Sequence, residues 1–200
     1  MRFLLVAVLL ASGTLLVSAA PPTPENGALI FTENGSCLVS AYTKSTYSHV
    51  ALVLYESGEP IVFEAKPGGV IKTKYERYLA TATAGKLNNG ESVRLWLMNP
   101  RIDYRQGELH PMLVYANQEL GTPYSVLPTV TGKTLNTQQC AQYVSSILET
   151  TPRFWFRDCK YQTPATLLRI ARPGYGSMHL IVERKSESSS VFARIFAAWK

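Results

Sequence analysis

One of the three cysteines, Cys140, lies where a helix could activate it as a nucleophile. Asn136 and Thr137 read as a helix start, and Gln139 stands where a capping-box partner would if Asn136 is the N-cap. In the predicted helix over residues 137–148, Cys140 falls near the first turn, where unsatisfied N–H groups and the helix dipole lower a thiol pKa. Cys140 also shares a helical face with apolar residues, so the pattern equally fits a buried, unreactive cysteine.

The second feature is His49 and Glu64, a pair of residues whose types could take part in catalysis. They lie in two β-prone segments, residues 48–55 and 61–65, joined by a turn that contains glycine, which is typical of a hairpin. Strand side chains alternate between faces, so a loop of even length directs both residues to the same face. A carboxylate beside an imidazole can fix its tautomer and stabilise its cationic form. A partly exposed pair without any role would fit this hairpin too.

The register of the hairpin decides whether the two side chains meet. A turn centred on the Ser-Gly dipeptide pairs Glu56 with Glu59, and therefore Ala51 with Glu64. His49 is then the diagonal neighbour of Glu64, within reach of a long side chain. We expect the opposite face to be the core, because it is continuously apolar: Val50, Leu52, Leu54, Ile61, Phe63 and Ala65.

The remaining segments predict a mixed α+β chain that positions these residues. We expect strands over residues 27–31, 70–72, 93–97 and 178–182 and a helical turn over 75–79. Helices are predicted over 111–120, ending at Gly121, and over 163–170, opened by Thr163 before a proline. Residues 125–134 read as a loop.

Composition restricts the class of protein. With 200 residues and only 17 % charged residues, the chain predicts one globular domain and not a disordered polyelectrolyte. The net charge of +6, from 20 Lys+Arg against 14 Asp+Glu, favours acidic partners such as anionic lipids or cell-wall polymers. Nucleic acid is not expected, because the basic residues are dispersed without a recognisable binding motif. His49, His110 and His179 lack metal-ligand spacing, so neither a metal nor a cofactor is expected.

The N-terminus is typical of a secretory signal peptide. A positive start is followed by an apolar run over residues 3–17 and by small residues, which predicts cleavage after Ala19 and export to the periplasm or outside the cell. An uncleaved anchor is the alternative, although the run is shorter than the ~20 residues that span a membrane. Export implies an oxidising compartment, in which Cys37 and Cys159 could bridge and leave Cys140 free.

Six short blocks, in this order, resemble the circularly permuted papain-like hydrolases, the YiiX-like branch of the NlpC superfamily, which is related to lecithin–retinol acyltransferase. Together they span most of the chain after residue 19. The matching blocks are residues 27–31 (GALIF), 47–53 (YSHVALV), 62–65 (VFEA), 120–125 (LGTPYS), 139–144 (QCAQYV) and 163–167 (TPATL).

The resemblance implies a permuted papain-like fold, with the nucleophile helix packed on a small antiparallel sheet. It also implies that Cys140 is the nucleophile, His49 the general base and Glu64 the residue that orients the imidazole. Such a mechanism needs an oxyanion hole. The backbone N–H of Cys140 is a natural donor, and Tyr124 is a side-chain candidate by resemblance. The chain departs from the family where Gly27 is followed by alanine, since the family often has Gly-Asp there.

We therefore expect an exported cysteine hydrolase of the amidase or peptidase type, acting through an acyl-thioester on cell-wall peptide (peptidoglycan) or lipid-linked amides. The alternatives are a lipid acyltransferase or esterase on the same site, and an inactive binding module. The expected organisation is a signal peptide over residues 1–19, the hydrolase domain over 20–184, and a polar linker with a short amphipathic helix over 185–200. That helix could contact a membrane surface or a partner, or dock on the protein's own core. The oligomeric state is left open.

Overall fold

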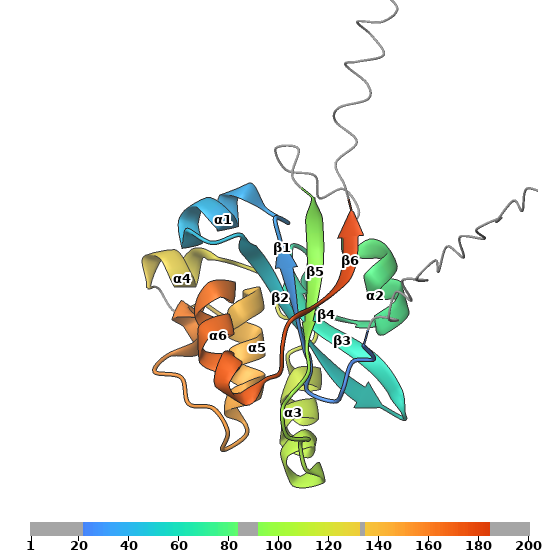
Figure 1. Ribbon diagram of the computed structural model, residues 1–200. Coiled ribbons are helices and arrows are strands. Elements are labelled where there is room, and N and C mark those ends of the chain that lie inside the picture. The colour runs from blue at the N-terminus through green and yellow to red at the C-terminus, as the bar shows by residue number, and fades with distance from the viewer. Residues whose placement is uncertain (1–21, 84–91, 133–134, 185–200) are drawn as a thin grey trace, which may run out of the picture.

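A six-stranded antiparallel sheet forms the centre of the protein (Figure 1). The computed structural model describes residues 22–83, 92–132 and 135–184. The sheet order is β4-β3-β2-β1-β5-β6. The strands are β1 (Leu29–Glu33), β2 (Tyr47–Glu56), β3 (Glu59–Lys66), β4 (Gly69–Lys74), β5 (Val93–Met98) and β6 (His179–Arg184).

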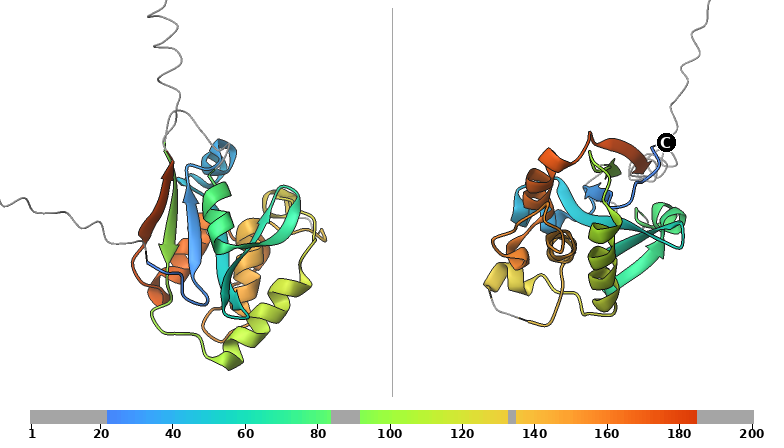
Figure 2. Two further views of the ribbon diagram at one scale, coloured as in Figure 1. Left: turned by 90° about the vertical axis from the view of Figure 1, so that its right-hand side faces the viewer. Right: turned by 90° about the horizontal axis from the view of Figure 1, so that it is seen from below.

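Helices cover both faces of this sheet. They are α1 (Cys37–Thr43), α2 (Tyr75–Thr81), α3 (Gln106–Gln118), α4 (Leu127–Thr131), α5 (Cys140–Glu149) and α6 (Pro164–Ala171), with short 3₁₀ turns η1 (Cys159–Tyr161) and η2 (Arg172–Gly174). Helices α5 and α6 lie side by side against one face, and α2 lies on the other (Figure 2). Within the described ranges, no helix is long and apolar enough to cross a bilayer.

The β2–β3 hairpin has the predicted register. Glu56 pairs with Glu59, and the ladder runs to Leu52 opposite Phe63, which directs the next pair to Ala51 and Glu64. The turn residues Ser57 and Gly58 have φ values of 51° and 84°. Positive φ at both central positions defines the type I′ turn, whose twist matches that of the flanking strands.

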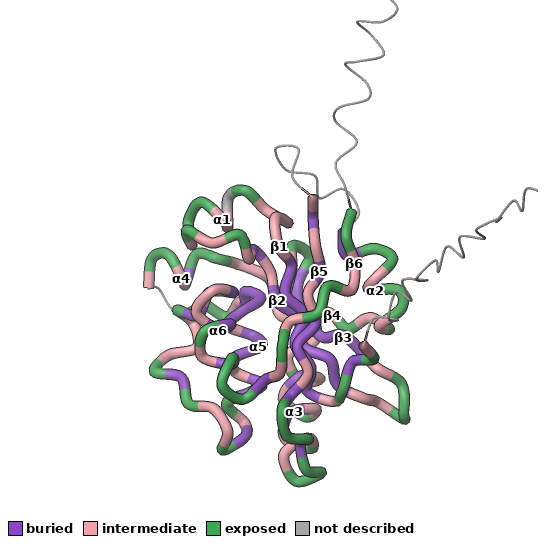
Figure 3. Tube along the Cα trace, viewed as in Figure 1, coloured by how far each residue is buried: buried purple, intermediate pink, exposed green. Residues whose placement is uncertain are grey.

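The expectation of a single core face was incomplete. The predicted apolar face does pack against α3, α5 and α6. However, the opposite face is also buried, because Ala51, Val53 and Val62 pack with Tyr78 of α2. The burial colours of Figure 3 show this doubly covered centre. His49 and Glu64 are therefore held inside the protein and not on an open sheet surface.

Two helices differ from the sequence predictions. Helix α3 starts at Gln106, five residues before the predicted start, and runs through Pro111. Its start is stabilised because the Glu108 carboxylate accepts the backbone N–H of Arg105 at 2.9 Å. The predicted loop over residues 125–134 contains the short helix α4, with Pro128 in its first turn and Gly132 as its C-cap.

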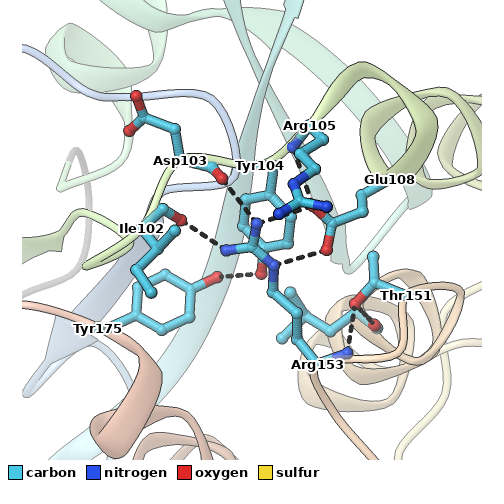
Figure 4. Close-up of polar contacts among 9 residues, drawn as sticks. Ile102, Asp103, Tyr104, Arg105, Glu108, Thr151, Arg153 and Tyr175 are labelled. Atoms are coloured by element: carbon cyan, nitrogen blue, oxygen red, sulfur yellow. Dashed lines mark hydrogen bonds and ion pairs between the residues drawn. The ribbon is translucent and has the colours of Figure 1, made fainter.

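A buried arginine ties α3 to two loops, and we call this group the Arg153 clamp: Arg153, Glu108 and Tyr104 with the carbonyls of Ile102 and Asp103. Arg153 binds both carboxylate oxygens of Glu108 at 2.7 Å. It also donates to the two carbonyls at 2.5 and 2.6 Å and stacks 4.0 Å above the Tyr104 ring (Figure 4). Four of its five N–H donors are thus used within the protein.

The edge of the sheet at β4 is covered by the chain that follows α3. Val70 of β4 donates to Thr122 O and accepts from Gly121 N, both at 2.9 Å. Gly69 makes this approach possible, because a Cβ there would lie 3.0 Å from Thr122 O, and its φ is +113°. The same loop continues directly into Tyr124.

Candidate active site

Cys140 is the first residue of α5 and is buried, with 5 % exposure. Gln139 is the N-cap, since its side-chain oxygen accepts the Ala141 N–H at 2.8 Å. The prediction of Asn136 as N-cap was wrong, because Gln138 forms a parallel bridge with Tyr124 and keeps the preceding residues out of the helix. The Cys140 sulfur therefore lies at the very start of α5, among N–H groups that have no intrahelical acceptor.

Glu64 is held by two cations on either side. Its Oε2 lies 2.8 Å from His49 Nε2, and its Oε1 lies 2.6 Å from Lys66 Nζ. The Glu64 side chain is only 2 % exposed. Burial raises its pKa, but the hydrogen bonds and charges of His49 and Lys66 outweigh burial and lower the pKa to about 2. Glu64 is consequently a carboxylate at all physiological pH values.

The His49 ring joins Glu64 to Cys140. Burial is the strongest influence on the ring and lowers its pKa. Hydrogen bonding to the Cys140 side chain and to Glu64, together with their charges, overrides burial and raises the pKa to about 9. Because Nε2 binds Glu64, Nδ1 is the nitrogen left for the sulfur. The ring is therefore held as the imidazolium at neutral pH, with Nε2 directed at Glu64.

Cys140 is also a free thiol, not part of a disulfide. All three cysteines are free thiols, so the bridge considered between Cys37 and Cys159 is not formed. The Cys159 thiol contacts Glu149 at 3.2 Å instead, and its pKa is raised to about 11, first by burial and then by this carboxylate. The charged neighbours of the two cysteines thus differ in sign: Cys140 faces an imidazolium, whereas Cys159 faces a carboxylate.

Tyr124 lies near the sulfur and is positioned by the main chain. The bridge to Gln138 consists of the bonds from Ser125 N to Gln138 O, 3.0 Å, and from Gln138 N to Pro123 O, 2.9 Å. The pKa of Tyr124 is raised to about 12 by burial and then by the charge of Cys140. Its hydroxyl thus remains a hydrogen-bond donor at neutral pH. The Cys140 N–H, at the first position of α5, is a second donor beside it.

Cys140, His49 and Glu64, which the sequence predicts as a site, are brought together by the structure, but sequence reasoning missed their surroundings. It did not identify Lys66, although a lysine two positions after Glu64 on the same strand points to the same face. It also missed α1 and α4, which border a cavity of about 210 Å³ that opens beside Cys140. The two apolar residues Val126 and Val130, four positions apart, were the available signal for a helix there.

Comparison with known proteins gives the class of this fold and site. Residues 23–151 match the family model of the permuted papain-like amidase enzymes, YaeF/YiiX, C92 family. The match covers more than half of the chain, so the protein belongs to this family, as the motifs predicted.

A solved structure supports the same fold. The crystal structure of the metalloprotein yiiX from Escherichia coli O157:H7 superposes with a TM-score of 0.57 at 16 % identity, covering 82 % of this chain and 99 % of that chain. The predicted α+β, permuted papain-like fold class is thereby confirmed. No curated protein sequence matches this chain. That relative is described as a metalloprotein, but the described residues here include no cluster of three His, Cys, Asp or Glu side chains that fits a metal.

Proposed function

We propose that this protein is an exported cysteine amidase in which Cys140 is the nucleophile, His49 the general base and acid, and Glu64 the orienting carboxylate. The observation that carries the proposal is the His49 ring, which is shared between the Cys140 side chain and the Glu64 carboxylate at the start of a helix. Three groups from separate segments of the chain meet in the arrangement that nucleophilic catalysis requires.

Acylation begins from the thiolate–imidazolium pair. The Cys140 sulfur attacks the carbonyl carbon of the amide, and the carbonyl oxygen becomes an oxyanion that accepts from the Cys140 N–H and the Tyr124 hydroxyl. The C–N bond then breaks, and His49 gives the Nδ1 proton to the leaving amine. The negative charge on sulfur is one cause of the high His49 pKa. When that charge is consumed in the thioester, the imidazolium becomes a stronger acid at the moment it must donate.

Deacylation uses the same groups in reverse order. Neutral His49 accepts a proton from water, the hydroxide oxygen attacks the thioester carbonyl, and the C–S bond breaks to release the acid and regenerate the thiolate. Glu64 stays ionised throughout, so it keeps Nε2–H directed at itself and Nδ1 directed at the sulfur.

Thiol labelling tests the proposal most directly. In a Cys37→Ser, Cys159→Ser background, iodoacetamide reports on Cys140 alone. We expect fast labelling at pH 7, and slowing of at least tenfold when His49→Ala is added, because the thiolate loses its cation. The matched control is His110→Ala, which removes an exposed histidine. Equal labelling rates with and without His49, and no hydrolysis of any amide, would indicate the inactive binding module.

Export is the remaining part of the proposal, and residues 1–19 lie outside the described residues. Expression of the full chain in a secreting host, followed by N-terminal sequencing, should give Ala20 as the first residue. Recovery of the protein with Met1 intact in the cytoplasm would contradict export. The predicted C-terminal helix over residues 185–200 also lies outside the described residues.

Ester hydrolysis or acyl transfer is the second candidate, and it is favoured by the apolar cavity beside Cys140. Both reactions share the acyl-thioester and differ only in the group attacked or in the acceptor that replaces water. Adding a primary amine or alcohol acceptor to the assay distinguishes them: transfer yields the acylated acceptor, whereas hydrolysis yields only the free acid.

A further inference from the structure

The cavity beside Cys140 is enclosed by α1, α4 and the start of α6. It measures about 210 Å³, and we call it the α1–α4 pocket. Its walls are mostly apolar, and Cys140 and Tyr124 are both among the residues that line it. The apolar walls come from Val39, Tyr42, Val126, Val130 and Pro164.

The polar side chains of this pocket are already engaged within the protein. The Thr43 and Thr129 hydroxyls each donate to a backbone carbonyl at 2.8 Å. The Thr163 hydroxyl caps α6, and the Gln139 side chain both accepts from and donates to the backbone. None of the described residues that line the pocket carries a charge. It offers a ligand dispersion and hydrophobic contact, with the Tyr124 hydroxyl and the start of α5 as polar groups beside the sulfur.

The pocket continues onto an apolar rim. Tyr42, Val126 and Val130 are 54 %, 42 % and 54 % exposed, respectively. These exposed side chains extend the apolar wall outward along α1 and α4, so a chain longer than the pocket can continue over an apolar surface. For scale, a closed apolar cavity of roughly 150 Å³ binds benzene.

The position of His49 decides which part of a substrate enters. His49 is not among the residues that line the pocket. The imidazolium must reach the leaving amine to protonate it, so the leaving group lies on the His49 side of the sulfur. The acyl group, on the other side of the scissile bond, then faces the pocket.

We propose, building on the function proposed above, that the α1–α4 pocket binds the hydrocarbon chain of the acyl group, so that the enzyme cleaves N-acyl amides of medium-chain fatty acids. Peptides of the cell wall carry charged groups next to the scissile amide, and this pocket has nothing to pair with them. At roughly 30 Å³ per small group, the pocket is filled by about six or seven methylenes.

The first test is a chain-length series of N-acyl aryl amides from acetyl to dodecanoyl. Each buried methylene should raise kcat/KM about three- to fourfold, with a plateau near octanoyl when the pocket is full. A flat profile, or faster cleavage of peptidoglycan stem peptides than of octanoyl amides, overturns the proposal.

A charged residue on the rim gives a matched pair of variants. Val130→Lys should lower the octanoyl-to-acetyl ratio of kcat/KM at least tenfold, because the ammonium must be desolvated when the chain enters. Val114→Lys makes the same change at a 41 % exposed valine of α3 that does not line the pocket, and it should leave the ratio unchanged. Equal ratios in the two variants contradict the proposal.

Alkylation separates this proposal from the hydrolytic function. In the Cys37→Ser, Cys159→Ser background, N-alkylmaleimides from ethyl to octyl should label Cys140 progressively faster. An increase with chain length but no turnover of any amide would support the apolar pocket and overturn the amidase function. Turnover of amides at rates that do not depend on acyl-chain length, with labelling rates that do not depend on maleimide chain length, would support the amidase function and overturn the acyl-chain pocket.

Discussion

Two clusters of charged side chains in this protein each contain a carboxylate with a low pKa, and they differ in the cation that lowers it. Glu64 and Glu108 both have pKa values of about 2, lowered by a neighbouring cation in each case. In the Arg153 clamp the cation is a guanidinium that cannot lose its proton, and nearly all its donors are used. At the proposed active site the cation is an imidazolium, which can release a proton.

Cavity size does not distinguish the two clusters by function. The hollow over the Arg153 clamp measures about 630 Å³, three times the α1–α4 pocket. The described residues that line it include no cysteine and no histidine, and four of the five N–H donors of its central arginine are already engaged. A buried charge cluster is thus competent for catalysis when one member can titrate and faces a nucleophile, and structural when every member is fixed.

The largest expected effect comes from removing the titrating member. His49→Ala should lower kcat/KM for the best amide by about 10³-fold or more, because both base and acid are lost. The unfolding free energy should fall by about 1 to 2 kcal/mol, because the buried Glu64 carboxylate loses His49 but keeps Lys66. Amide hydrolysis followed by product detection measures the first quantity and urea unfolding the second. If His49→Ala kept more than a tenth of the wild-type activity, His49 would not be the titrating group that distinguishes this cluster from the Arg153 clamp.

The Arg153 clamp should affect stability and leave activity nearly unchanged. Arg153→Ala leaves the mostly buried Glu108 carboxylate unpaired and removes two loop contacts, so we expect a loss of about 2 to 3 kcal/mol in unfolding free energy. The activity per folded molecule should stay within about twofold. Arg153→Lys is the control that keeps the charge without the planar fork, and it should recover only part of the stability. Full stability in Arg153→Ala would show that the clamp is not structural.

Glu64→Gln tests the pH dependence that the active site imposes. The active form contains the imidazolium, so wild-type kcat/KM should fall as the pH rises through about 9. Glutamine keeps an acceptor but removes the charge that stabilises the cation, which lowers the His49 pKa. We expect kcat/KM at pH 7 to drop about 10- to 100-fold and the alkaline fall to begin at a lower pH. An unshifted alkaline limb in the pH profile would contradict the role of Glu64.

Lys66→Met should give the smallest effect. Its ammonium is 41 % exposed, and exposed ion pairs are worth roughly 0.2 to 1 kcal/mol. We therefore expect kcat/KM to fall about two- to fivefold, because Glu64 loses one of the two groups that position it. The alkaline limb should move to higher pH, because removing a positive charge beside Glu64 favours the His49 cation. Lys72→Met, which breaks a comparably exposed pair with Glu56, is the matched control and should leave the pH profile unchanged. Identical pH profiles of kcat/KM for the two variants would show that Lys66 has no influence on the site.

The parts predicted from sequence are those that short-range rules determine. Strand alternation and the turn dipeptide were enough to align His49 with Glu64, because the hairpin closes over a few residues. The helix start at Cys140 was placed three residues too early, since the Tyr124–Gln138 bridge that delays it joins residues far apart in the chain. Helix α4 was missed because its exposed valines border a cavity instead of the core. Burial of the His49 face depends on α2, which local patterns do not position.

The loop that covers the β4 edge has a consequence for how the molecule behaves at high concentration. An uncovered edge strand is a template on which another chain can add a strand and begin to aggregate. Here the backbone of Gly121 and Thr122 occupies that position. Because Tyr124 follows two residues later, the contact that blocks intermolecular sheet growth also anchors a hydroxyl beside the sulfur. A substitution that displaces this loop, such as Gly69→Ala, would therefore have two effects. It would expose the unpaired backbone of β4, and it would loosen the segment that positions Tyr124 at the proposed catalytic centre.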